Sequence, residues 1–155
     1  KQLIDMINEN LSVVKGNIVC IEKAMQETHN INAAVRLIDV DEYKIADYNM
    51  FYGFFAGVLA GNYDIEQVYV DGLLKIGEKN VQALGELLEK IDAIASDKLV
   101  VVTVSAAEEE LTETIRVIEE TFIMMPMKKL YKMQNSPLHD ERGKFSCKFF
   151  CKFTI

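Results

Sequence analysis

The sequence predicts a mainly α-helical protein, a bundle of four to five helices that allows a small two-stranded β element (99–104 with 144–155); an α+β fold is the alternative. Three observations lead to this prediction. Apolar residues recur at helical spacing from residue 4 to residue 25, residues 45–59 are almost continuously apolar, and five of the six residues 99–104 are β-branched. A chain of 155 residues with 50% apolar residues suits one domain with a single core.

The first segment has the clearest periodicity. Successive spacings of three and four place its apolar residues on one helical stripe, with Asp5, Glu9 and Lys15 off it. Gly16 falls inside the pattern, where a glycine costs a helix about 1 kcal/mol relative to alanine, so a bend is expected there. The stripe consists of Ile4, Ile7, Leu11, Val14, Ile18, Ile21 and Met25.

A second helix is expected to begin near Asp39, because Asp39 and Glu42 have the spacing of a capping box. From Ile45 to Leu59 this helix is apolar on nearly every side, as expected for the central helix of a bundle. Its small residues recur every four positions and predict a close crossing with another helix. They are Gly53, Gly57 and Gly61.

Capping signals predict the remaining helices. Asp64 with Gln67 opens a third helix, Asn80 opens a fourth that continues to Ala95, and Ser105 with Glu108 opens a fifth that ends at Pro126. Between the last two, residues 99–104 favour an extended strand because β-branched side chains suit the pleated backbone. Residues 135–143 are expected to form a loop.

The charge changes sign near residue 125. The chain has a net charge of -7, made of -12 up to Phe122 and +5 from Ile123 onward. This predicts two regions, an acidic helical domain (1–125) and a basic C-terminal segment (126–155). In the last twelve residues every second side chain is apolar, from Phe145 to Ile155, and the positions between are mostly polar, which predicts a half-buried strand antiparallel to residues 99–104.

No arrangement of residues indicates catalysis. His29 and His139 belong to no zinc or triad pattern, and Cys20, Cys147 and Cys151 have the properties of core residues. Capping explains the acidic residues near position 39, and no glycine-rich phosphate loop follows a strand. The sequence therefore predicts no catalytic residue, no cofactor and no metal site, and it favours a non-enzymatic protein.

The functional hypothesis is a soluble, acidic interaction protein that associates with itself or with a protein partner through its first helix or its small-residue face. One alternative is a small-ligand binder or small enzyme with a pocket among the aromatic residues of helix 45–60. Another is binding of an anionic surface by basic and aromatic side chains of the tail, which otherwise serves as an internal strand or is unselected. The tail residues are Lys144, Phe145, Lys148, Phe149, Lys152 and Phe153.

Composition also bears on partners and location. An acidic chain disfavours double-stranded nucleic acid, which requires a positive surface. No run of eighteen apolar residues is present, so no transmembrane segment is expected. The lack of a basic and then apolar leader favours a cytoplasmic location, while the first residue, Lys1 rather than Met, leaves a cleaved leader open.

Overall fold

The computed structural model describes residues 2–24, 30–77, 80–95, 97–105, 123–126 and 149–153. These residues form an α/β fold with a parallel sheet, so the prediction of a helical bundle is wrong, and so is the α+β alternative. The described elements, in chain order, are α1 (Gln2–Asn10), β1 (Asn17–Glu22), β2 (Arg36–Asp39), α2 (Tyr48–Gly61), β3 (Ile65–Val70), the 3-10 helix η2 (Leu73–Lys75), α3 (Val81–Ile94), β4 (Leu99–Ser105), β5 (Ile123–Pro126) and β6 (Phe149–Phe153).

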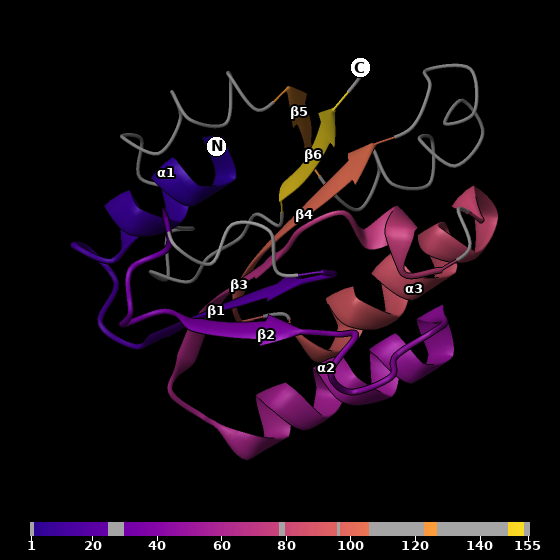
Figure 1. Ribbon diagram of the computed structural model, residues 1–155, viewed down its shortest axis with the longest axis horizontal. Helices are drawn as coiled ribbons and strands as arrows, with labels where there is room; N and C mark the ends of the chain where they lie inside the picture. The colour runs from indigo at the N-terminus through magenta and orange to yellow at the C-terminus, as the bar shows by residue number, and fades with distance from the viewer. Residues whose placement is uncertain are drawn as a thin grey trace.

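The described strands form one sheet in the order β2-β1-β3-β4-β6-β5. Every neighbouring pair is parallel. Helix α1 lies on one face of this sheet, and α2 and α3 lie side by side on the other, which gives three layers (Figure 1). Both faces are covered around β1, β3 and β4, which explains why their residues 18–21, 68–70 and 99–102 are continuous apolar runs and do not alternate.

The predicted first helix, residues 4–25, is two elements. Helix α1 ends at Asn10, and after a turn the chain enters β1 with five consecutive buried residues. Gly16 lies in that turn, where a Cβ would overlap the carbonyl oxygen of Asp64, so the close approach of the chain before β1 to the chain before β3 requires a residue without a side chain. The spacing of Ile18 and Ile21 suits a helix by coincidence, since β1 is buried on both faces and needs no alternation.

The capping signals at Asp39 and Asp64 are also misleading. Asp39 ends β2, and the helix begins at Tyr48 with Asp47 as its N-cap, whose side chain accepts a hydrogen bond of 2.8 Å from the backbone N–H of Met50. Asp64 precedes β3, where a helix was predicted, and its own N–H donates to the side chain of Asn62. The predicted end of the second helix near Gly61 is confirmed.

Two elements agree with their sequence patterns. Helix α3 begins after Asn80, which accepts a hydrogen bond of 3.1 Å from the N–H of Ala83, and β4 covers the β-branched run. Residues 149–153 of the tail pair with β4 as predicted, but in parallel and within a larger sheet. Residues 123–126 form β5 where a helix end was predicted. Most of that fifth helix, 106–122, lies outside the described residues, as do the loop 135–143, His29 and His139.

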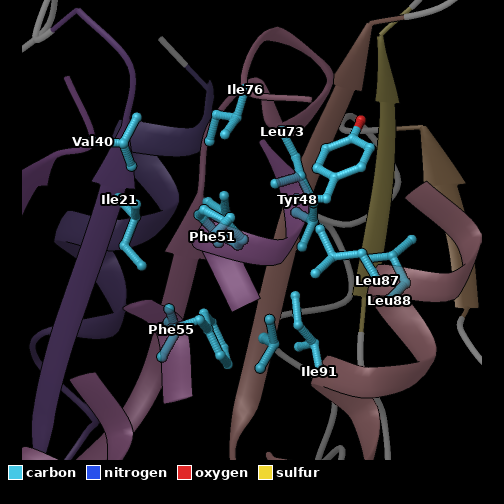
Figure 2. Packing of buried hydrophobic residues seen from close by; sticks show 14 of the residues in the cluster. Ile21, Val40, Tyr48, Phe51, Phe55, Leu73, Ile76, Leu87, Leu88 and Ile91 are labelled. Atoms are coloured by element: carbon cyan, nitrogen blue, oxygen red, sulfur yellow. The ribbon is translucent and has the colours of Figure 1, made fainter. Parts of the chain in front are cut away.

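The larger core lies between the sheet and the helices α2 and α3. Phe51 and Phe55 on α2 have no exposed surface, and their rings pack with centroids 6.1 Å apart (Figure 2). Leu87 and Ile91 of the neighbouring helix α3 belong to the same cluster. The aromatic residues of α2 that were predicted to line a pocket thus divide between this core, which holds Tyr48, Phe51 and Phe55, and partly buried positions at its margin, Tyr52 and Phe54.

A smaller core lies under α1. Leu3, Met6 and Ile7 cover residues of β1, β3 and β4 on the opposite face. A buried polar link anchors this helix: the side-chain amide of Asn10 donates to the Tyr69 hydroxyl at 2.6 Å, and that hydroxyl donates to Gln67 at 2.8 Å. Burial raises the pKa of Tyr69, so this hydroxyl keeps its proton and its role as a donor.

The glycines of α2 make no close helix crossing. A Cβ built at Gly53, Gly57 or Gly61 meets no atom within 4 Å, so the predicted contact with another helix is wrong for the described chain. Helix α2 instead packs beside α3 through its opposite, aromatic side. None of the described helices has the length and apolar character needed to cross a membrane.

Candidate functional site

The strand order places a break in the winding of the sheet between β1 and β3. From β1 the chain moves to β2 on one side, and it then returns past β1 to place β3 on the other side. Because all the strands are parallel, their carboxyl ends share one edge, and the loops after β1 and β3 leave this edge in opposite directions. Open α/β sheets bind their ligands in the crevice at such a point.

One row of polar residues follows this edge. Glu22 at the end of β1 pairs in register with Asp39 at the end of β2. In the same register Val70 of β3 pairs with Ile21 and with Val102, so the next residues, Asp71 and Thr103, lie at the same level as Glu22. Glu22, Asp39 and Thr103 are 5%, 9% and 2% exposed. Three carboxyl groups and one hydroxyl therefore lie on adjacent strand ends, at the level where the apolar strands stop.

Thr103 fixes the position of Asp71. The Thr103 hydroxyl donates to Oδ1 of Asp71 at 2.5 Å and accepts from the backbone N–H of Gly72 at 2.7 Å. Gly72 has a φ of 65°, in the left-handed region that glycine adopts without strain, and this turn directs its N–H to Thr103. No described residue donates a hydrogen bond to the other oxygen of Asp71, so one oxygen of a held, partly buried carboxyl group is available to a ligand.

Asp39 has a different task. Its Oδ1 accepts hydrogen bonds from the backbone N–H groups of Ala24 at 3.2 Å and Asp41 at 2.9 Å. Ala24 lies in the left-handed region with a φ of 64°, an uncommon conformation for a residue with a side chain. Asp39 therefore ties the loop after β1 to the end of β2.

Lys23, directly after β1, places a basic side chain at this edge. Its ammonium donates to the carbonyl oxygen of Lys75 at 3.2 Å and lies 3.9 Å from the carboxyl of Asp41. The two side chains are 33% and 47% exposed, so the ion pair contributes little to stability. Lys23 therefore connects the loop after β1 with the segment after β3.

Two of the edge carboxyl groups act on a neighbouring buried thiol. Burial raises the pKa of the Cys20 thiol, and the charges of Glu22 and Asp71 raise it further, which places both carboxyl groups within electrostatic reach of one sulfur atom. Among the described residues, no three His, Cys, Asp or Glu side chains form a group that could hold a metal ion.

The tail residues predicted to bind an anionic surface are placed only in part. Lys144, Phe145 and Lys148 lie outside the described residues. Phe149, Lys152 and Phe153 belong to β6, whose backbone pairs with β4 and β5. Binding through these residues stays a prediction, and so does the division of the chain near residue 125.

Glu22, Asp39 and Asp71 were missed because β1, β2 and β3 were not recognised as strands, and Thr103 was missed because its strand, although predicted, was not paired with them. Glu22, Asp71 and Thr103 were given no role, and Asp39 was interpreted as a helix cap. A usable signal was present: an acidic residue directly ends the apolar runs 18–21 and 68–70. In a parallel sheet those two positions share one edge.

The chain matches no protein-family model, no curated protein and no solved structure.

Proposed function

We propose that the protein binds a small ligand with a cationic group at the carboxyl edge of the sheet, between β1 and β3, with Asp71 as the main contact. The observation that carries this proposal is the hydrogen-bonded chain from Gly72 through Thr103 to Asp71, which holds one carboxyl oxygen and leaves the other available. Residues around a binding group are expected to hold it in this way before the ligand arrives.

The chemistry of the edge favours a cation over an anion. A phosphate needs backbone or side-chain donors, but the N–H groups of Gly72, Ala24 and Asp41 already donate to protein oxygens. The neighbouring carboxyl groups of Glu22 and Asp39 would also repel it. Two sources of positive charge fit: an organic amine, or a hydrated divalent ion such as Mg²⁺, which commonly binds through one or two carboxylates and retains water.

The test is a titration of the full chain with MgCl₂, with putrescine as an organic dication and with sodium phosphate as the anionic probe, followed by changes in NMR amide shifts. One of the two cations should shift the amides of Gly72 and its neighbours, whereas phosphate should not. Asp71→Asn should weaken the binding at least tenfold, about 1.4 kcal/mol.

The matched control is Asp97→Asn, which changes the same charge at a side chain that is 64% exposed and stands before β4, at the amino edge of the sheet. It should bind like the unmodified chain. Equal binding by Asp71→Asn, or no response to either cation, would contradict the proposal.

A further inference from the structure

The outer face of α2 carries no charge. None of the fourteen residues from Tyr48 to Gly61 is acidic or basic, although a helix on the surface of a globular protein ordinarily has charged residues on its outer side. The side facing the core holds Tyr48, Phe51, Phe55 and Leu59, and the opposite side is exposed, with Met50 at 45%. Apart from Asn49, the exposed side is apolar as well as uncharged.

The glycines on this face have no role in the packing of the described residues of one chain. A Cβ at Gly53, Gly57 or Gly61 would meet open space, so alanine would fit at each position. Each of the two glycines inside the helix costs about 0.8–1 kcal/mol relative to alanine. This cost is offset if another helix approaches the bare backbone closely, as it does where small residues line a helix contact.

Large and small residues are divided along one stripe. Met50, Phe54, Gly57 and Gly61 follow at spacings of four, three and four, with the two large residues first and the two glycines last. Reversing the stripe places each large residue opposite a glycine: Met50 opposite Gly61, and Phe54 opposite Gly57. Tyr43, 56% exposed, extends the large end, since its ring lies 5.5 Å from that of Phe54.

We propose that two copies of the chain associate through this outer α2 face, with their α2 helices antiparallel about a two-fold axis between Phe54 and Gly57. The division of the stripe selects a second copy as the partner, because the complement it requires is the same stripe reversed, as in an isologous interface. Charge agrees with this choice. Chains of net charge -7 repel each other, and an uncharged face lets them meet with the least repulsion.

The chain's own basic segment fits this face less well. Seven basic residues follow Ile123, and the α2 helix has no carboxyl group with which they could pair. The proposal is independent of the ligand site at the carboxyl edge, because Asp71 and Thr103 are not part of α2.

Sedimentation velocity of the full chain over a wide concentration range tests the association. The unmodified chain should sediment as a dimer of the 17.6 kDa protomer, and Gly57→Lys, which has open space in one chain, should sediment as a folded monomer. Gln82→Lys adds the same charge at an exposed position of α3 and should leave the dimer intact. A monomeric unmodified chain, or a Gly57→Lys chain that remains dimeric with a normal circular dichroism spectrum, would overturn the proposal.

Cross-linking tests the direction of the helices. In a chain with Cys147→Ser and Cys151→Ser, the double variant Met50→Cys/Gly61→Cys should form a covalent dimer on oxidation. The two new thiols cannot bridge within one chain, since a step of eleven positions along a helix separates them by about 16 Å. Met50→Cys alone should stay monomeric on a denaturing gel. Efficient cross-linking by Met50→Cys alone would indicate parallel helices and refute the antiparallel arrangement.

Discussion

Replacing Thr103 tests whether its hydroxyl organises the carboxyl edge. Thr103→Val keeps the shape of the side chain but removes the donor to Asp71 and the acceptor for the Gly72 N–H. The residue is 2% exposed, so water cannot readily replace either partner. We expect the variant to fold with a lower free energy of unfolding and a less fixed Asp71.

The size of the effect follows from the two bonds. A hydrogen bond to a charged group contributes about 1.5–3 kcal/mol, and a neutral bond contributes about 0.5–1.5 kcal/mol. The added methyl group returns about 0.8 kcal/mol through burial. Thr103→Val should therefore cost about 2–3 kcal/mol. Thr103→Ser keeps both bonds and loses one methyl group, so it should cost only about 1 kcal/mol.

Urea denaturation of the full chain, followed by far-ultraviolet circular dichroism, measures both variants, and this probe suits a chain without tryptophan. The order of the two variants is the decisive result. If position 103 were an ordinary buried apolar position, the Val variant would be at least as stable as the Ser variant. If the hydroxyl makes both hydrogen bonds, the Ser variant must be the more stable of the two. If Thr103→Val proves as stable as Thr103→Ser, the role assigned to the hydroxyl is wrong.

Three further predictions concern the α2 core and the tail. Gly77→Ala should lower the free energy of unfolding by about 1–3 kcal/mol, because the new Cβ would overlap the ring of the buried Tyr48 side chain; a urea midpoint equal to that of the unmodified chain would contradict this. Burial raises the pKa of Tyr48 from 10.0 to about 12, so the folded state disfavours the phenolate and stability should fall as the pH rises from 10 to 12. Tyr48→Phe, which removes a buried hydroxyl without a partner in the described chain, should lose less stability over that range and be at least as stable at neutral pH; a steeper loss in urea titrations would refute the assignment. If the tail binds an anionic surface, replacing Lys144, Lys148 and Lys152 by Glu should abolish co-sedimentation with phosphatidylserine vesicles, and unchanged co-sedimentation would remove that hypothesis.

The sequence predicts correctly where local and tertiary signals agree. Helix α3 has its cap at Asn80 and its apolar side at Leu84, Leu88 and Ile91, and those three side chains are indeed buried. Strand β4 is recognised because its β-branched residues favour an extended backbone irrespective of their surroundings. Neither element needs information from a distant part of the chain.

The errors at β1 and β3 come from burial on both faces. A half-buried strand shows alternation, but these two strands are buried at almost every position, and spacing alone does not distinguish their short apolar runs 18–21 and 68–70 from a buried helix. Composition favours the strand, since 65–70 contains Ile, Tyr and two Val residues, but the cap at Asp64 was given more weight. The cap motif fails there because Asn62 accepts the Asp64 N–H and turns the chain directly into the sheet.

The candidate site depends on a pairing of strands that no single segment specifies. Asp71 acquires its role from Thr103, thirty-two residues later, and both are placed by the register of β3 with β4. Once parallel strands are assumed, the carboxyl ends of 17–22 and 65–70 must share an edge, and the polar residues that end them become neighbours by geometry. Recognising the fold class is therefore the step that makes this site predictable. The residues at this edge are ordinary in their local sequence, and only the sheet brings them together.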